Sequence, residues 1–271
     1  MSTSASTERP SMRYLVTGAA SGIGRATARL LAERGDAVFL VDRDRDRLTD
    51  VTRGLQQAGA RAGGTVADLT DPFEPARVIE EALAFLNGLD CLVSNAGAAR
   101  YGPLADLACE EFDSLIALNL RATWLLAKAA LPALQDSGGN VVTTASICGH
   151  HPAPPQGAYS VAKAGLLMLV KQMALEWGPL GVRSNSVSPG PTQTGATQGV
   201  FNDRSDPKQA AIIELRESRI PLRKLGQAHE VAEAILFLSS PAASHITGVD
   251  ILVDGGLSVV LMEAAGAAAG R

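Results

Sequence analysis

A short apolar run that leads directly into a glycine-rich turn is the feature of this sequence that most limits its fold. Residues 14–17 read Tyr-Leu-Val-Thr, and Gly18, Gly22 and Gly24 follow them at the start of a segment with helical apolar spacing. That segment stops at a glycine, and a second apolar run follows at residues 37–41. This order predicts a strand, a helix and a second strand, in which the helix joins two parallel strands. Continuous apolar strands indicate a sheet that is covered on both faces.

The same alternation continues along the rest of the chain. Further helices are predicted around Asp46–Ala58, Pro75–Asn87, Glu110–Gln135, Ala158–Trp177 and Ala228–Ser239, and further strands near Gly64–Val66, Leu89–Ser94, Asn140–Ala145, Val182–Val187 and Asp250–Val253. The predicted fold class is therefore α/β, with a doubly wound parallel sheet of the Rossmann type and helices on both faces.

We expect one domain, because no internal repeat or linker divides this pattern. It spans residues 13–258. Within it, residues 191–226 are interpreted as a lid over the substrate. Residues 1–12 are rich in Ser and Thr and are expected to form a disordered tail, and residues 259–271 a C-terminal tail.

Composition and charge exclude several classes of protein. Of the 271 residues, 46% are hydrophobic and 19% charged, which is typical of a globular protein rather than a disordered one. The net charge is −4 and no basic run with interleaved aromatic residues occurs, so a nucleic-acid partner is not expected. Cys91, Cys109 and Cys148 are scattered, which argues against a disulfide framework and a CxxC metal site.

Targeting signals are not apparent in the sequence. The first residues lack the apolar stretch of a secretory signal. Residues 137–162 carry no charged side chain but contain three prolines and several hydroxyls, which a lipid-facing helix would not combine. We therefore expect a cytoplasmic protein that does not insert into a membrane.

The glycines and the end of the second strand together favour a dinucleotide site. Glycines where a strand turns into a helix let a pyrophosphate approach backbone N–H groups. Asp42 follows Gly24 by 18 residues, near the spacing of an acidic residue that binds the adenosine ribose. A carboxylate there would repel a 2′-phosphate, so NAD is favoured over NADP. Arg43 could pair with such a phosphate, but a solvated charge is the preferred interpretation.

Tyr159 and Lys163 are four residues apart in a predicted helix and therefore share one face. An ammonium near a phenol favours the phenolate and lowers the pKa of the tyrosine from about 10. The pair could thus act as a general base for an alcohol proton. By itself this spacing is common.

In combination with other motifs, the sequence resembles the short-chain dehydrogenase/reductase family over about residues 13–258. The motifs that carry the resemblance occur in the family's order, and they are Thr17-Gly-Ala-Ala-Ser-Gly-Ile-Gly24, Ser94-Asn-Ala-Gly97, Asn119, Ser146, Tyr159-Ser-Val-Ala-Lys163 and Pro189-Gly190. One departure is Ser94, which replaces the first asparagine of the usual Asn-Asn-Ala-Gly.

The resemblance implies a role for each matching residue. Tyr159 would be the catalytic acid/base, Ser146 would hydrogen-bond the reacting oxygen, Lys163 would also hold the nicotinamide ribose, and Asn119 would order a water for proton relay. The implied cofactor-binding residues are Gly18, Ser21, Gly22, Ile23, Gly24, Asp42, Asp68, Leu69, Asn95, Ala96, Gly97, Tyr159, Lys163, Pro189, Gly190, Thr192 and Thr194.

The expected function is hydride transfer between NAD(H) and a secondary alcohol or ketone. A 3-oxoacyl-carrier-protein reductase that uses NADPH is an alternative, and a non-catalytic NAD-binding sensor is a less favoured one. His150 and His151 lack carboxylate or cysteine companions at ligand spacing, so no metal site is expected. Surplus apolar residues on the helices that carry Asn119 and Tyr159 indicate a subunit interface, and the resemblance implies a homodimer or homotetramer.

Overall fold

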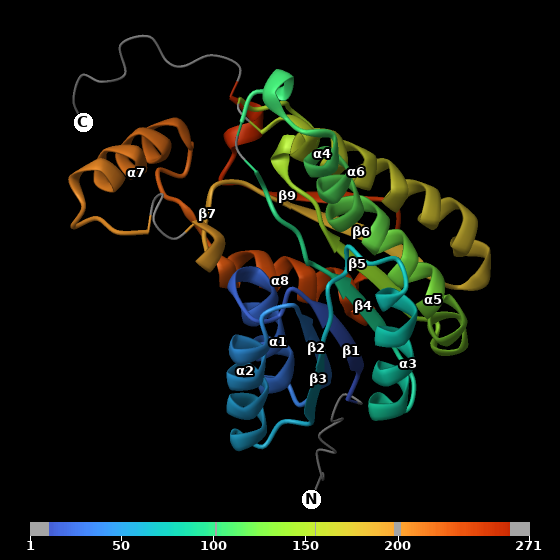
Figure 1. Cartoon of the computed structure of the whole chain (residues 1–271). Helices are drawn as coiled ribbons and strands as arrows, with labels where there is room; N and C mark the ends of the chain where they lie inside the picture. The colour runs from blue at the N-terminus through green and yellow to red at the C-terminus, as the bar shows by residue number, and fades with distance from the viewer. Residues whose placement is uncertain (1–10, 101, 155, 198–201, 261–271) are drawn as a thin grey trace, which may run out of the picture.

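A seven-stranded sheet forms the centre of the computed structural model, which describes residues 11–100, 102–154, 156–197 and 202–260 (Figure 1). The strand order is β3-β2-β1-β4-β5-β6-β9, and every pairing in this sheet is parallel. The strands are β1 (Arg13–Thr17), β2 (Ala37–Asp42), β3 (Ala62–Val66), β4 (Cys91–Ser94), β5 (Asn140–Thr144), β6 (Arg183–Pro189) and β9 (Asp250–Val253). The predicted doubly wound parallel sheet is confirmed.

Helices cover both faces of the sheet, as Figure 1 shows. On one face lie α1 (Gly22–Glu33), α2 (Arg45–Gln57) and α8 (Ala228–Ser239), and on the other α3 (Glu74–Leu86), α5 (Ala122–Ser137) and α6 (Gly157–Trp177). The strands contribute side chains to the apolar layers on both faces of the sheet. In β1, Leu15 enters one apolar cluster while Tyr14 and Val16 enter the other, and none of the three is more than 2% exposed. The continuous apolar strands are thus explained by burial on both faces.

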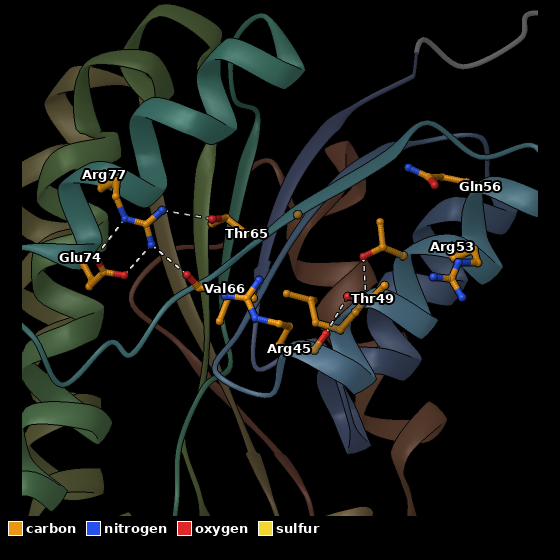
Figure 2. A pocket seen from close by; sticks show the side chains of 11 residues that line it. Arg45, Thr49, Arg53, Gln56, Thr65, Val66, Glu74 and Arg77 are labelled. Atoms are coloured by element: carbon orange, nitrogen blue, oxygen red, sulfur yellow. Dashed lines mark hydrogen bonds and ion pairs between the residues drawn. The ribbon is translucent and has the colours of Figure 1, made fainter.

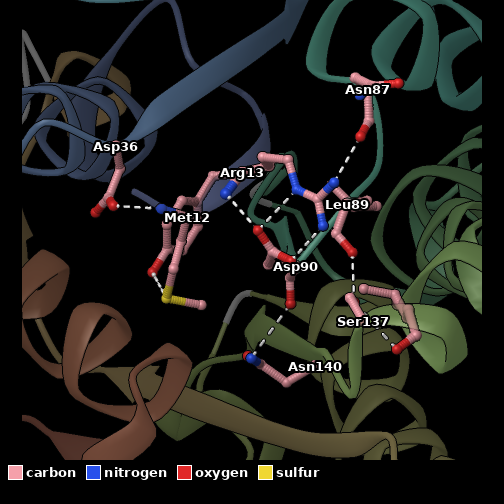
Figure 3. A network of polar contacts seen from close by, with 10 residues as sticks. Met12, Arg13, Asp36, Asn87, Leu89, Asp90, Ser137 and Asn140 are labelled. Carbon is pink, nitrogen blue, oxygen red and sulfur yellow. Dashed lines mark hydrogen bonds and ion pairs between the residues drawn. The ribbon is translucent and has the colours of Figure 1, made fainter. Parts of the chain in front are cut away.

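An ionic contact joins the strands at their amino ends (Figure 3). The Arg13 guanidinium donates from Nη2 to Asp90 Oδ1 at 2.7 Å and from Nε to Asp90 Oδ2 at 2.9 Å. The backbone carbonyl of Asp90 in turn accepts from the backbone N–H of Asn140 at 3.0 Å. These contacts connect the starts of β1, β4 and β5, so the carboxyl ends, where the sequence motifs lie, meet at the opposite edge of the sheet.

The predicted helix Glu110–Gln135 is present but is not uniformly wound. It consists of α4 (Cys109–Ile116), a π-helical turn (Ala117–Arg121) and α5. A π turn widens the ring of backbone hydrogen bonds and is often found at functional sites. Apolar spacing alone could not reveal it. Asn119 therefore lies in the π turn rather than in a regular α-helix.

The region between residues 191 and 226, which the sequence left without elements, contains one further helix. This helix, α7 (Pro207–Arg219), lies apart from the sheet on the side of the strands' carboxyl ends (Figure 1). Two short strands, β7 (Thr192–Gln193) and β8 (Gly226–Gln227), pair in parallel and bring the two ends of the region together. Residues 198–201 of this region, and most of the predicted tails, lie outside the described residues.

One helical segment, Cys109–Ser137, is long and apolar enough by composition to cross a membrane. In this structure it is a core element instead. Leu126, Ala130 and Leu134 are fully buried, and α5 packs against α3 and the sheet. Buried helices of globular proteins commonly pass such a test, and the feature does not indicate a membrane protein.

Candidate active site

The glycine turn lies at the point where the strand order reverses, between β1 and β4. Gly18 has φ +66°, a conformation that favours glycine. A Cβ on Gly18 would come within 2.9 Å of the Ala96 Cα atom, and one on Gly24 within 2.2 Å of the Gly18 carbonyl oxygen. The turn therefore packs directly against the segment that follows β4. In doubly wound sheets a ligand binds in the crevice at this position.

The residues of the turn fit a dinucleotide pyrophosphate. Helix α1 begins at Gly22, and the Ser21 side chain makes no capping hydrogen bond to it, so the first N–H groups of the helix keep their capacity to bind an anion. Gly22 has φ +53°, and a Cβ there would lie 3.1 Å from the Thr194 Cβ. Thr194 thus approaches the turn from the segment after β6, and Ile23 follows in the first turn of α1. Between Thr194 and Ile23, the glycine turn exposes backbone atoms rather than side chains.

Asp42 ends β2 beside this turn. Its carboxylate accepts from the backbone N–H groups of Ala20 and Asp44, each at 3.0 Å. These contacts hold the half-buried Asp42 carboxylate at the rim of the glycine turn.

Asp68 and Leu69 follow β3, the next strand outward. Hydrogen bonds from the backbone and the hydroxyl of Thr70 lower the pKa of Asp68, and the nearby positive charge of Arg43 acts in the same direction. Leu69 is buried. Arg43 therefore lies within the electrostatic field of the Asp68 carboxylate.

Asn95 connects the carboxyl ends of three strands. Its backbone N–H and that of Ala96 both donate to Thr17 Oγ1 at 3.0 Å, and its side-chain Nδ2 donates to the Thr17 carbonyl at 3.0 Å. The Thr144 hydroxyl donates to Asn95 Oδ1 at 3.0 Å. Side chains and backbone of β1, β4 and β5 are thus cross-linked below the glycine turn.

Lys163 is a buried residue of α6 that contacts the carboxyl end of β5. Its Nζ donates to the Thr144 carbonyl at 2.7 Å and lies 5.6 Å from the centre of the Tyr159 ring. Burial lowers the pKa of Lys163 to about 8. The ammonium and the tyrosine predicted from their spacing are therefore brought together.

Asn119, which lies in the π turn, approaches Lys163 near Gly97. Its Nδ2 donates to the carbonyls of Ala98 at 2.9 Å and Leu115 at 3.0 Å. A Cβ on Gly97 would lie 2.8 Å from Asn119 Oδ1 and 3.5 Å from Lys163 Nζ. Glycine at position 97 thus leaves the space in which Asn119 and Lys163 approach each other.

Ser146 precedes a 3₁₀ turn (Ile147–Gly149) that packs against α6. Ser146 is 7% exposed, and its Oγ accepts from the backbone N–H of Cys148 at 3.1 Å, which leaves the hydroxyl proton to donate elsewhere. A Cβ on Gly149 would lie 2.8 Å from the Lys163 carbonyl oxygen. Ser146 and the 3₁₀ turn that follows it, called the serine turn below, therefore pack closely on the helix that carries Tyr159 and Lys163.

His150 anchors the other end of the serine turn, a contact that sequence reasoning missed. Its Nε2 lies 2.7 Å from Asp250 Oδ2, and Asp250 also accepts from the Ser186 hydroxyl at 2.5 Å. Asp250 is 100 residues away in the sequence, so no local signal predicts this pair. Among the described residues no group of three or more His, Cys, Asp or Glu side chains could hold a metal ion.

The segment after β6 completes the site. Gly190 approaches the turn after β9 so closely that a Cβ would lie 2.8 Å from the Asp254 Cα. The hydroxyl of the buried Thr192 donates to the Gly190 carbonyl at 2.9 Å. Pro189 is the last residue of β6. These residues lie at the carboxyl edge of the sheet, as the sequence predicted.

Of two cavities in the structure, only the smaller lies at the site. The larger, about 650 Å³, lies between α2, β3 and α3, away from the motifs (Figure 2). There Arg77 contacts Glu74, the Thr65 hydroxyl and the Val66 carbonyl, which stabilises the open edge of β3. The smaller, about 420 Å³, lies next to Ser146 and is lined by Ile147, Cys148, His151, Pro152, Ala153 and residues 257–260.

The fold and these motifs define a nicotinamide-dependent oxidoreductase of the short-chain dehydrogenase/reductase family, to which the chain belongs. A family model described as enoyl-(acyl carrier protein) reductase matches residues 18–258. The chain is 39% identical to cis-4-hydroxycyclohexanecarboxylate dehydrogenase of Sinomonas cyclohexanicum over 91% of this chain and 96% of the relative.

Two further relatives show the range of activities in the family. A 3-oxoacyl-(acyl-carrier-protein) reductase of Thermotoga maritima is 33% identical over 90% of this chain and 97% of the relative. The crystal structure of a gluconate 5-dehydrogenase from Burkholderia cenocepacia, in complex with NADP and tartrate, superposes with a TM-score of 0.86 at 29% identity, over 94% of this chain and 98% of the other.

Removal of the Lys163 charge is expected to stabilise the protein in the absence of cofactor. A pKa lowered from 10.5 to about 8 corresponds to a cost of about 3 kcal/mol for keeping the buried ammonium charged. This cost is fully present below pH 8. It disappears as the pH rises toward 10.5, because the folded protein loses the proton first.

Urea unfolding of Lys163→Met and wild type between pH 7 and 10 measures this effect. At pH 7 the variant should have the higher free energy of unfolding, and the difference should shrink toward pH 10. A difference that does not change with pH would contradict the electrostatic explanation.

Proposed function

We propose that this protein catalyses NAD-dependent oxidation of a secondary alcohol to a ketone, and the reverse reduction, with Tyr159 as the acid/base. The observation that carries the proposal is the convergence of Ser146, Tyr159 and Lys163, where the serine turn packs on α6 and the Lys163 ammonium lies 5.6 Å from the Tyr159 ring. A non-catalytic NAD-binding protein would not require this combination, which disfavours the sensor alternative.

In this proposal each residue acts on the hydroxyl of the substrate. The Lys163 ammonium favours the phenolate of Tyr159, whose Oη takes the hydroxyl proton as the alcohol is oxidised. The Ser146 hydroxyl donates to the reacting oxygen and positions it, while Asn119 orders a water next to Lys163 for relay of the proton. Bound NAD would supply the hydride acceptor.

Tyr159→Phe should lower kcat by about 10²- to 10⁴-fold, the usual contribution of a general acid/base. NAD binding, measured by calorimetry, should be retained, because the glycine turn, Asp42 and Lys163 still provide contacts to the dinucleotide. Tyr14→Phe is a matched control, since Tyr14 is a buried tyrosine of β1 outside the site. Near-normal turnover of Tyr159→Phe would remove the tyrosine from the mechanism.

The preference for NAD over NADP rests on Asp42. Its carboxylate, held by the N–H groups of Ala20 and Asp44, could accept from the ribose hydroxyls and would repel a 2′-phosphate. Arg43, the residue that could favour such a phosphate, also lies near the Asp68 carboxylate, whose negative charge would oppose a phosphate there. The gluconate 5-dehydrogenase complex contains NADP, so the family as a whole does not decide between the cofactors.

Asp42→Asn should lower kcat/KM for NAD by about tenfold or more, because hydrogen bonds to a charged group contribute about 1.5–3 kcal/mol. The kcat/KM for NADP should rise in the same variant, since the repelling charge is removed. Asp46→Asn removes an exposed carboxylate four residues away and should change neither value. Initial rates with both cofactors measure the effect, and an unchanged NAD/NADP ratio in Asp42→Asn would refute the assignment.

For the substrate we propose a cyclic secondary alcohol. The relative with 39% identity is a cis-4-hydroxycyclohexanecarboxylate dehydrogenase, and the cavity of about 420 Å³ beside Ser146 has mainly apolar walls that suit a ring.

A 3-oxoacyl-carrier-protein reductase activity has support from the relative of 33% identity. It is less favoured for two reasons. Asp42 disfavours NADPH, and two of the basic residues in 200–226, which could have met an acidic carrier, are paired within the chain. Arg204 pairs with Glu217 and Lys224 with Glu230.

A cytoplasmic homo-oligomer is part of the proposal. On α6, Val161, Met168 and Leu175 recur every seven residues and are 51%, 62% and 73% exposed. Such a stripe is typical of a helix that packs on another helix. Phe237 of α8 and Leu252 of β9 are exposed at the far edge of the sheet, 43% and 41% respectively. Two separate apolar surfaces favour a tetramer with two kinds of interface over a dimer.

Light scattering should give a mass near four times the 28.1 kDa of one chain. Met168→Glu places a charge in the centre of the α6 stripe and should reduce the mass to that of a dimer. Leu104→Glu, an exposed leucine outside both surfaces, should leave it unchanged. A monomeric wild type at micromolar concentration would overturn the proposal.

A further inference from the structure

The serine turn and the two histidines that follow it form one hydrogen-bonded unit. The backbone N–H of Gly149 donates to the Ser146 carbonyl at 2.9 Å. The backbone N–H groups of His150 and His151 both donate to the Ile147 carbonyl at 3.0 Å. A displacement at the end of this unit would therefore reach the Ser146 hydroxyl and the cavity that His151 lines.

The two ends of this unit are held in different ways. At the start, directly after β5, the backbone N–H of Ala145 donates to the Val187 carbonyl of β6 at 2.8 Å. At the end, the chain has left the sheet, and the His150 side chain returns to it, with Nε2 2.7 Å from Asp250 Oδ2. A side-chain contact thus does at the end what strand pairing does at the start.

Asp250 is itself held in a fixed orientation. It is the first residue of β9 and lies beside Ser186 of β6 in the parallel register. Asp250 Oδ1 accepts from the Ser186 hydroxyl at 2.5 Å, so Oδ2 is left to face His150. The side chains of His150 and Asp250 are 32% and 10% exposed. Pairs that are partly exposed contribute little to stability, and we expect the importance of this one to lie in where it holds the turn.

We propose that His150 and Asp250 are a positioning pair, which holds the serine turn so that the Ser146 hydroxyl and the cavity wall face the reacting group of the substrate. In the part of the chain that the structure describes, neither residue lines the cavity, so the pair acts through the turn. This inference rests on the proposed alcohol oxidation and adds two residues that set its geometry.

His150→Ala should lower kcat for a cyclic secondary alcohol by about 10- to 100-fold, because a misplacement of about 1 Å can cost about 10²-fold. The dissociation constant of NAD, measured by calorimetry, should not change, because the glycine turn lies at β1. His150→Gln can still donate a hydrogen bond to Asp250 and should recover most of the lost kcat. His245→Ala removes an exposed histidine outside the site and is the matched control.

A double-mutant cycle tests whether the two residues act together. Asp250→Ala should cause the same loss of kcat as His150→Ala, and the losses should not add in the double variant. Unchanged kcat in His150→Ala, an equal loss in His150→Gln, or additive losses in the double variant would each overturn the pair. The comparison of His150→Ala with His150→Gln does not depend on the folding of Asp250→Ala.

Labelling of Cys148 tests the position of the turn without cofactor or turnover. Cys148 lies in the turn and lines the cavity, Cys91 is buried, and the exposed Cys109 is removed by Cys109→Ser. In that background the rate at which dithionitrobenzoate labels Cys148 reports how far the turn opens. His150→Ala should raise this rate several-fold, and His150→Gln should leave it near that of the unchanged histidine.

The two readouts separate the pair from the proposed function. Equal labelling rates with and without His150→Ala, in a protein that oxidises secondary alcohols, would refute the pair and leave the reaction intact. Faster labelling in His150→Ala, in a protein that forms no NADH from any secondary alcohol, would support the pair as the holder of the turn and count against the proposed reaction.

Discussion

The cross-link made by Asn95 is the contact on which the arrangement of the candidate site depends. Parallel strands in a twisted sheet diverge at their ends, yet here the carboxyl ends of β1, β4 and β5 must present one continuous surface. Asn95 achieves this through Thr17 on one side and Thr144 on the other. The carbonyl of Thr144 also accepts from Lys163. The floor of the glycine turn and the ammonium beside Tyr159 are therefore positioned by the same strand end, so a shift of β5 would disturb both.

The burial of Lys163 shows what this arrangement costs. A lysine enclosed by protein loses hydration, and its pKa falls to about 8 accordingly. A single hydrogen bond to Thr144 replaces only part of that hydration. The π turn that carries Asn119 is a second local departure from regular structure. Both irregular features lie around Gly97, where any larger side chain would overlap Asn119. Clusters of this kind are expected where geometry serves chemistry rather than stability.

Much of the fold and the position of the site could be predicted from the sequence, because both depend on local patterns. Strand and helix periodicity placed β1, α1 and α8, and the glycine spacing located the crevice between β1 and β4. The pairing of His150 with Asp250 could not be predicted, since it joins residues that only the sheet brings together. The π turn was missed for a different reason, as its side-chain pattern continues that of the flanking helices. Helix α7 has no continuous apolar stripe, because only Ile213 on it is buried.

The same difference in packing divides the candidate site into two parts. The serine turn and α6 carry Ser146, Tyr159 and Lys163. Helix α6 packs into the large apolar cluster on one face of the sheet. Helix α7 is attached through a separate small cluster, in which Ile213 and Ile220 meet Leu257. Because the two clusters share no buried residue among those described, a substitution on the inward face of α7 can change what the cavity accepts without disturbing the residues around Tyr159. Substrate recognition in such an arrangement can diverge while the proton-transfer geometry stays fixed, which fits a family whose members are similar in fold and differ in substrate.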